Sequence, residues 1–315
     1  TGIPKILFRS FESWADFFAI QNAVFGVDAD SRLFVQGSLA FTGNLNLYMG
    51  QLAAGGTLIA EDVFLPGKWE QVMARERANG IYLIPSKLLM LPRVFKGVNA
   101  NIRTIISGSQ SLGRKDAEVL KKIFPNTEIT LYYGASELNY ITYVKSADMT
   151  EERNLIGKPF PGVRVFIQDD EMYVDNAFHV ENITVPYSLR DSGRMDTQGN
   201  FYFLGRTDDI VGVRGRKVSM MKIENALEEV AGITEAAVVL LPKEKDADMP
   251  AEIVSAFVTV EGTDVPENLR QQLKEKLADF EIPKRVIALE TLPKNTSGKV
   301  DKARLKKMWI EQEPQ

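Results

Sequence analysis

Short β-prone runs alternate with helical patterns in the first part of the chain, and this alternation constrains the fold more than any other feature. A helix is predicted from Ser13 to Phe25, with Ser13 and Asp16 matching a capping box at its start. Another helical pattern spans Trp69–Asn79. The β-prone runs are Arg32–Gln36, Thr57–Ala60, Gly80–Ile84, Ile102–Ile106 and Glu128–Leu131. The alternation predicts a parallel sheet flanked by helices.

The character of the sequence changes in its second half. From Gly162 to Leu204, short strands with turn signals such as Asp169-Asp170 and Gln198-Gly199-Asn200 predict a small β subdomain. A domain boundary is expected near Gly205. Beyond it, strands and two helices predict a small α+β domain. The apolar positions that mark its helices are Ile223, Ala226, Leu227 and Val230 in the first, and Leu269, Leu273, Leu277 and Phe280 in the second.

The composition excludes several classes of protein. With 315 residues, of which 44% are apolar, the chain can fill two or three compact cores. It has no long apolar run and its start lacks the pattern of a signal peptide, so we expect a cytoplasmic protein with no transmembrane segment. A net charge of −4 argues against a nucleic-acid partner. The absence of cysteine excludes disulfides, zinc–thiolate sites and thiol nucleophiles.

Two polar motifs follow predicted strands. Ser107-Gly108-Ser109 comes after one strand, and Tyr132-Tyr133-Gly134-Ala135-Ser136-Glu137 after the next. In open α/β sheets, ligands bind outside the carboxyl ends of the strands. A tyrosine there offers a flat face to a base, a glycine permits close backbone approach, and serine and glutamate supply oxygens for phosphate and Mg²⁺. For the second motif alone, an aromatic core strand that ends in a polar loop is an equally good interpretation.

Three further motifs complete a pattern that resembles a known family. The five motifs, in chain order, are Thr1–Lys5, Tyr133–Glu137, Arg190–Gly193, Gly205–Glu224 and Pro293–Lys299. They are similar to the phosphate loop, the Tyr-Gly-x-Thr/Ser-Glu motif, the ribose-binding aspartate, the hinge and the catalytic lysine loop of adenylate-forming enzymes. That superfamily includes acyl-CoA synthetases, firefly luciferases and peptide-synthetase adenylation domains. Five motifs in the right order are a strong signal, although each alone is weak.

The resemblance implies an α/β fold. A flanked parallel sheet and a small β-barrel-like subdomain would be the remnant of a large domain, followed by a small α+β C-terminal domain. We place the AMP-binding domain at residues 1–205, with its sheet subdomain at 1–157 and its β subdomain at 158–205, and a mobile lid at 206–315. Full-length relatives possess an N-terminal portion that precedes Thr1. We therefore expect the 315-residue chain alone to be inactive and to expose an apolar face, which that segment or a second copy would cover.

The resemblance also implies which residues bind ATP. Asp191 would accept both ribose hydroxyls, and Arg206 would add a cationic contact to the same sugar. Ser136 and Glu137 would lie at the α-phosphate, and Glu137 would also bind Mg²⁺. Tyr133 would stack on adenine. The other residues assigned to the adenine and the phosphates are Thr1, Gly2, Lys5, Ser107, Gly108, Ser109 and Gly134.

Three more residues are assigned to movement and chemistry. By resemblance, Asp208 is the hinge about which the small domain turns, and Gly215 lies where the pantetheine arm threads. Lys299 would bridge the substrate carboxylate and the α-phosphate, and it forms the catalytic set together with Glu137 and Ser136. An acid that is already ionised needs no general base. Lys299 and Mg²⁺ would instead neutralise the repulsion between two anions.

The activity implied is ATP-dependent conversion of a carboxylic acid to an acyl-adenylate, followed by thioester formation with coenzyme A. Such an enzyme is an AMP-forming acid–thiol ligase that uses ATP, Mg²⁺ and coenzyme A. The uncharged segment Phe41–Asn44 favours a fatty or aryl acid. Two alternatives stay open: adenylation of an amino acid or aryl acid for a separate carrier protein, and a non-catalytic nucleotide-binding fragment that acts only with a partner. His179 is interpreted as a strand or surface residue outside the site.

Overall fold

The computed structural model describes residues 6–39, 41–213, 215–243, 252–262, 264–295 and 300–311. The chain divides into two compact units. The first comprises Thr1–Leu189 and Gly193–Phe203, and the second comprises Arg190–Ser192 and Leu204–Gln315. We refer to them as the N-terminal and C-terminal units.

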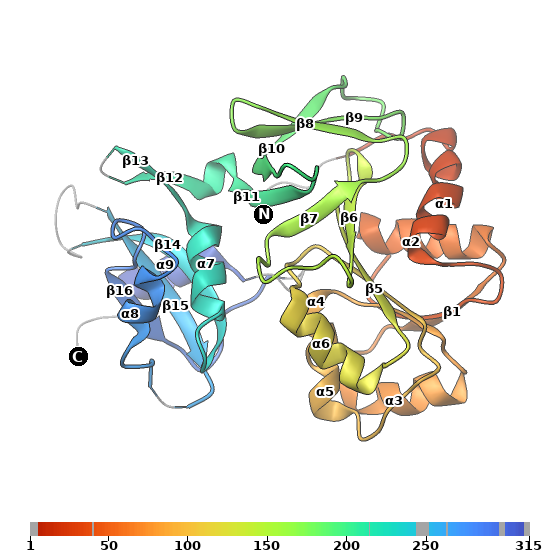
Figure 1. Cartoon of the computed structure of the whole chain (residues 1–315), viewed down its shortest axis with the longest axis horizontal. Coiled ribbons are helices and arrows are strands. Elements are labelled where there is room, and N and C mark those ends of the chain that lie inside the picture. The colour runs from red at the N-terminus through yellow and green to blue at the C-terminus, as the bar shows by residue number, and fades with distance from the viewer. Residues whose placement is uncertain are drawn as a thin grey trace. The chain divides into compact units, whose positions relative to one another are not determined.

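An eleven-stranded sheet, in the order β2-β1-β3-β4-β5-β6-β7-β11-β10-β9-β8, runs through the N-terminal unit (Figure 1). Its first five strands are parallel, which confirms the predicted parallel sheet. They are β1 (Arg32–Gln36), β2 (Thr57–Glu61), β3 (Gly80–Tyr82), β4 (Thr104–Gly108) and β5 (Glu128–Ala135). Their carboxyl ends lie along one edge of the sheet, because parallel strands share a direction.

The other six strands extend this sheet rather than form a sheet of their own. The segment predicted as a β subdomain supplies four of them, β8 to β11, and β8 pairs with β9 through a turn at Asp169 and Asp170, which both have positive φ. This turn was among the predicted turn signals. The six strands are β6 (Asn139–Lys145), β7 (Leu155–Pro159), β8 (Arg164–Gln168), β9 (Glu171–Asp175), β10 (Tyr187–Met195) and β11 (Phe201–Arg206).

Helices cover both faces of the parallel strands, so alternate residues of each strand enter different cores. In β1, Phe34 packs in one buried cluster while Leu33 and Val35 pack in the other. The Phe34 face is covered by α3 (Pro66–Arg75), α4 (Pro85–Leu88), α5 (Leu91–Val94) and α6 (Arg114–Ile123). The opposite face is covered by α1 (Glu12–Phe25) and α2 (Thr42–Ala53). Burial on both sides explains why these strands read as apolar runs.

One local prediction is wrong. Helix α1 begins at Glu12, and Ser13 and Asp16 do not form the predicted capping box. The Ser10 hydroxyl instead accepts a hydrogen bond from the Ser13 N–H at 3.2 Å. Ser13 is already helical, so its own hydroxyl donates back to the Ser10 carbonyl at 2.9 Å. The N-cap position is occupied by Phe11, whose side chain makes no capping hydrogen bond.

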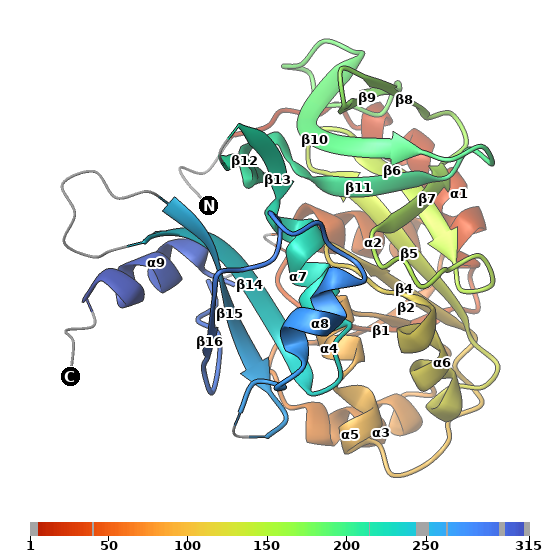
Figure 2. The ribbon, with the colours of Figure 1, turned by 60° about the vertical axis from the view of Figure 1, so that its left-hand side comes forward.

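The C-terminal unit contains a hairpin and a three-stranded sheet, β14-β15-β16 (Figure 2). Its core gathers all four apolar positions predicted for the first helix. The second predicted helix is shorter than expected, because Leu277 and Phe280 lie beyond its last residue, although Leu277 is still buried. The elements are η1 (Thr207–Asp209), β12 (Ile210–Val213), β13 (Arg216–Ser219), α7 (Met220–Glu228), β14 (Ile233–Pro242), β15 (Glu252–Val260), α8 (Leu269–Lys274), β16 (Arg285–Ala288) and α9 (Lys302–Glu311).

The two units together give the expected mixed α/β fold with a small C-terminal part. Within the described ranges, no helix combines the length and the apolar character that crossing a membrane requires.

Candidate functional site

The turn between β5 and β6 carries two predicted catalytic residues, Ser136 and Glu137. The Ser136 Oγ lies 2.9 Å from the Oγ1 of Thr42, which is in the first turn of α2. The side chains of Ser136, Glu137 and Thr42 are all partly exposed. Two hydroxyls therefore meet beyond the end of a parallel strand, and the next residue of the turn carries a carboxylate. These are the oxygen groups that phosphates and Mg²⁺ require. Thr42 belongs to the uncharged segment Phe41–Asn44, which was assigned to the acyl substrate and not to the phosphates.

The motif Ser107-Gly108-Ser109 at the end of β4 offers the candidate site mainly backbone atoms. Ser107 is fully buried, and its hydroxyl donates to the Leu83 carbonyl at 2.7 Å, so it is used within the fold. A Cβ on Gly108 would lie 2.5 Å from the Tyr132 ring, and the position therefore requires glycine. Ser109 has φ of +69° and is exposed. Of these three predicted adenine contacts, Ser109 is the one whose side chain is available to a ligand.

Tyr133 and Gly134 lie on the last part of β5. Tyr133 is partly exposed, and its ring centroid is 5.8 Å from that of Phe203 at an interplanar angle of 34°. Gly134 is exposed, and a Cβ there would lie 2.6 Å from the carbonyl oxygen of Asn139 on β6. The glycine is therefore required by the close approach of two strands. The same lack of a side chain leaves the backbone beside Tyr133 open to a flat ligand.

A network of buried tyrosines lies directly beneath this end of the sheet. The Tyr82 and Tyr132 hydroxyls are 2.7 Å apart, and the Tyr140 hydroxyl donates to the Gly43 carbonyl of α2 at 3.2 Å. Burial raises the pKa of all three phenols well above the usual value, so they stay neutral. They support the site through packing and hydrogen bonds. This network could not be predicted from local sequence, since its members come from separate strands.

Asp191 and Arg206, both assigned to the ribose, are brought together. Asp191 is 4% exposed, and its Oδ1 lies 3.6 Å from the Arg206 Nε. The Arg206 side chain is 64% exposed, so the pair adds little to stability. Arg190 has φ of +60°, and its carbonyl accepts a hydrogen bond from the Thr207 hydroxyl at 2.9 Å. The arrangement is a shielded carboxylate beside an accessible cation.

The predicted hinge and channel residues lie at the start of the C-terminal unit. The backbone of Asp208 belongs to η1, whereas its side chain lies outside the described residues. Gly215 has φ of +77° in the loop between β12 and β13. No atom lies within 4 Å of a Cβ built there, so the backbone conformation and not crowding favours glycine.

Thr1, Gly2, Lys5 and Lys299 lie outside the described residues. The ends of the lysine loop are nevertheless described, and they are held together. Lys294 and Val300 form an antiparallel bridge, and the Asp301 N–H donates to the Pro293 carbonyl at 2.8 Å.

Glu224 anchors the segment that follows the lysine loop. Its Oε1 accepts hydrogen bonds from the Val238 N–H at 2.7 Å and the Lys302 Nζ at 2.8 Å. Burial raises the pKa of Glu224, although Lys302 opposes the shift. Lys302 lies three positions after Lys299. The hinge motif included Glu224, but the sequence did not reveal its partners.

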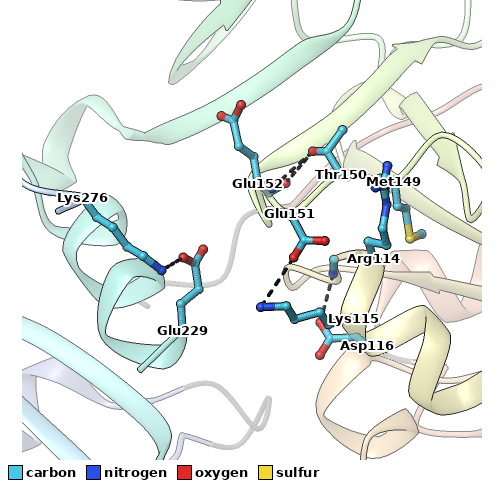
Figure 3. Close-up of polar contacts among 10 residues, drawn as sticks. Arg114, Lys115, Asp116, Met149, Thr150, Glu151, Glu152, Glu229 and Lys276 are labelled. Carbon is cyan, nitrogen blue, oxygen red and sulfur yellow. Dashed lines mark hydrogen bonds and ion pairs between the residues drawn. The ribbon is translucent and has the colours of Figure 1, made fainter. Parts of the chain in front are cut away.

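Other polar contacts lie outside the proposed site residues (Figure 3). In the N-terminal unit, the Lys115 Nζ is 3.6 Å from the Glu151 Oε2, and the Arg114 Nε donates to the Met149 carbonyl at 2.9 Å. No group of three His, Cys, Asp or Glu side chains in the described part of the chain could hold a metal ion. A single carboxylate such as Glu137 still fits Mg²⁺, because this ion binds through one or two carboxylates together with substrate phosphates.

Comparison with known proteins decides the family. The family model described as AMP-binding enzyme matches residues 1–177, and that described as AMP-binding enzyme C-terminal domain matches residues 222–299. The chain belongs to the AMP-binding enzyme family. This membership agrees with the five motifs and with the observed fold.

Individual relatives agree with the family assignment. The chain is 27% identical to the uncharacterized acyl-CoA ligase YhfT of Bacillus subtilis, over 100% of this chain and 68% of that protein. It is 25% identical to a 2-succinylbenzoate–CoA ligase of Listeria monocytogenes, over 97% of this chain and 68% of that protein. The structure of O-succinylbenzoate coenzyme A synthetase (MenE) of Bacillus subtilis, in complex with ATP and magnesium ion, superposes with a TM-score of 0.83 at 19% identity, over 97% of this chain and 68% of that chain. The chain thus spans about two thirds of the length of these relatives.

Proposed function

We propose that the chain forms the greater part of an AMP-forming acid–thiol ligase. It converts a carboxylic acid and ATP to an acyl-adenylate and then transfers the acyl group to coenzyme A. The observation that carries this proposal is the turn at Ser136 and Glu137, where the Thr42 hydroxyl adds a third oxygen group beyond the carboxyl end of β5. Relatives named as CoA ligases support coenzyme A as the acceptor, rather than a separate carrier protein or a non-catalytic role.

The first step needs positioning more than proton transfer. The substrate carboxylate is ionised at neutral pH, so its oxygen attacks the α-phosphorus directly and pyrophosphate leaves. The Ser136 and Thr42 hydroxyls donate hydrogen bonds to the α-phosphate oxygens. Mg²⁺, held by Glu137 when it is bound, neutralises phosphate charge. Tyr133 stacks on the adenine, and Asp191 accepts the ribose hydroxyls with Arg206 beside it.

The second step uses the C-terminal unit differently. Lys299 contributes its cation to the adenylation step. We assign residues 206–315 as a lid that turns about Asp208, so that Lys299 leaves and Gly215 approaches the pantetheine arm. The thiol sulfur then attacks the acyl carbon, the thioester bond forms and AMP departs. We retain residues 1–205 as the AMP-binding domain.

A fatty or aryl acid is the proposed substrate. The segment Phe41–Asn44 is uncharged. Gly43 in this segment contacts the tyrosine network, because a Cβ there would lie 2.9 Å from the Tyr132 hydroxyl and 3.1 Å from the Tyr82 hydroxyl. A wall of neutral aromatic groups suits an apolar acid. ATP and coenzyme A are cytoplasmic metabolites, and we place the reaction in the cytoplasm.

An apolar groove of about 540 Å³ lies between α1 and α2. Phe11 and Leu52 line it and are 67% and 57% exposed. We propose that additional chain of the longer natural protein covers this groove, because the relatives are about half as long again as this chain. Size-exclusion chromatography of the natural protein should show a monomer. A dimer that dissociates when Leu52 is replaced by Asp would assign the groove to a second copy.

The test of the proposed function is ATP–pyrophosphate exchange by the natural full-length protein across a panel of fatty, aryl and amino acids. We expect exchange with an apolar acid, followed by AMP release when coenzyme A is added. If exchange occurs but a thioester forms on a phosphopantetheinylated protein and not on free coenzyme A, a carrier protein is favoured as the acceptor. No exchange with any acid would support a non-catalytic role.

A further inference from the structure

Arg9 connects three separate segments of the N-terminal unit. Its guanidinium donates to the Ser13 carbonyl at 3.2 Å, to the Phe178 carbonyl at 2.7 Å and to the Ser136 carbonyl at 3.1 Å. Burial lowers the pKa of Arg9 to about 10, so the side chain stays charged at neutral pH. Within the described ranges, the acceptors of this partly buried cation are three neutral main-chain oxygens, and one of them belongs to the turn proposed to bind the α-phosphate.

The other carbonyls of that turn are also held from outside it. The Glu137 carbonyl accepts a hydrogen bond from the Val180 N–H at 2.9 Å, and the Leu138 carbonyl accepts one from the Asn176 Nδ2 at 3.1 Å. The segment 176–181 thus holds the turn through two hydrogen bonds to its carbonyls. The same segment is tied to the residue before Arg9, because the Glu181 N–H donates to the Phe8 carbonyl at 2.8 Å.

Arginine suits this position because its planar guanidinium carries five donors in a fixed arrangement. The three acceptors of Arg9 lie on three different segments, and two of its terminal nitrogens reach them. A lysine ammonium is a single point at the end of a flexible chain, so it cannot reproduce these directions together. Arg9 also lies four positions after Lys5, the last residue of the phosphate-loop motif.

We propose that Arg9 is a positioning residue for adenylation. It fixes the turn of Ser136 and Glu137 relative to the chain that leaves the phosphate loop, and thereby sets where the α-phosphate and Mg²⁺ are held. The inference rests on the proposed function, since it assumes that this turn binds those groups. Arg9 acts through the turn and has no assigned contact with the substrate.

The experiment uses the natural full-length protein with Arg9→Met and Arg9→Lys. ATP–pyrophosphate exchange is measured as a function of Mg²⁺ concentration, together with thermal unfolding. We expect Arg9→Met to lower kcat/KM for ATP about 10- to 100-fold, because a misplacement of about 1 Å has effects of this size. The concentration of Mg²⁺ needed for half-maximal rate should rise. Arg9→Lys should be intermediate in both.

Arg32→Met is the matched control. Arg32 is also partly buried, and its Nε donates to the Glu76 carbonyl at 2.8 Å, but it lies at the start of β1, away from the carboxyl ends of the strands. We expect this variant to lose stability without a change in the Mg²⁺ dependence. If Arg9→Met behaves like Arg32→Met, its role is structural and the inference is overturned.

Two further results are decisive. If Arg9→Met does not fold, Asn176→Ala loosens the same turn by removing the donor to the Leu138 carbonyl. An altered Mg²⁺ dependence in that variant and in Arg9→Lys supports the inference, and a normal dependence in both overturns it. A wild-type protein that exchanges no pyrophosphate with any acid overturns the proposed function and the inference together. An active wild type with unaffected variants overturns the inference alone.

Discussion

Replacement of Gly108 by alanine should destabilise the N-terminal unit and weaken nucleotide binding together. The new Cβ would lie 2.5, 2.6 and 2.7 Å from three atoms of the Tyr132 ring. The ring has little room to retreat, because its hydroxyl is 2.7 Å from that of Tyr82 and its centroid is 4.4 Å from that of the Tyr140 ring. On the side of α2, Gly43 brings backbone close to the same hydroxyl.

The size of the effect follows from these distances. Ordinary contact begins at 3.4 Å, so the shortest approach of 2.5 Å must open by about 0.9 Å. Overpacking of this kind costs about 1–3 kcal/mol, and we expect the upper end because the neighbours are fixed. For a unit of this size, that corresponds to a fall in Tm of about 6–12 °C. Displacement of the end of β4 would also move Ser109, which is assigned to the adenine.

Thermal unfolding and titration with a nonhydrolysable ATP analogue test this prediction, with Gly67→Ala as the control. Gly67 lies in the first turn of α3, and no atom lies within 4 Å of a Cβ built there. The same chemical change should therefore raise stability by about 0.4–1 kcal/mol at Gly67. If Gly108→Ala were as stable as the wild type, the tyrosine network would be mobile and could not be the rigid support described above.

Three other predictions concern single side chains. Asp191→Ala should weaken binding of an ATP analogue by about 1.5–3 kcal/mol per charge-assisted hydrogen bond lost, and an unchanged Kd would remove Asp191 from the site. Lys299→Ala should slow adenylation about 10²- to 10³-fold while thioester formation from ready-made acyl-adenylate survives, and equal losses in both half-reactions would contradict the assigned role. Glu224→Gln should flatten the pH dependence of unfolding. Burial raises the pKa of Glu224 above its usual 4.5, so the protonated carboxyl favours the folded state. The contribution of Glu224 to the free energy of unfolding is therefore greatest below pH 4.5 and is lost as the pH rises through the folded-state pKa. Parallel stability curves for the two proteins would refute this.

The parallel half of the sheet was predictable because each strand is a continuous apolar run between turn signals. β1 was predicted with its observed bounds, Arg32–Gln36. The end of β5 was not, because the strand continues to Ala135 through pairing with β6. Nor did the local sequence indicate that the segment after Gly162 would extend the same sheet. Strand pairing joins distant segments, and local patterns carry no information about it.

The site shows the same limit at the level of single residues. Resemblance to the family's motifs brought Ser136 and Glu137 into the candidate set, and it assigned Asp191 and Arg206 to the same sugar. It did not indicate the contacts of Thr42 and Arg9 with Ser136, which span 94 and 127 positions of sequence. Ser107 fits the motif, but its hydroxyl donates to the carbonyl of Leu83, the residue after β3, which only the fold reveals. Motifs therefore nominate residues for contact with the ligand, whereas the residues that hold them in place emerge from tertiary contacts.

Such supporting contacts also bear on how the proposed lid would move. Ser219 caps α7 by accepting a hydrogen bond from the Lys222 N–H at 3.2 Å, and its hydroxyl donates to the Leu204 carbonyl at the start of the C-terminal unit. Glu224, one turn further along α7, holds Lys302 just after the lysine loop. The Ser219 contact with Leu204 crosses the hinge, so a turn about Asp208 would break it, whereas the Glu224 contact with Lys302 lies within the lid. A turn about Asp208 would carry Lys299 with the whole C-terminal core, because moving the loop alone would break the buried Glu224 contact.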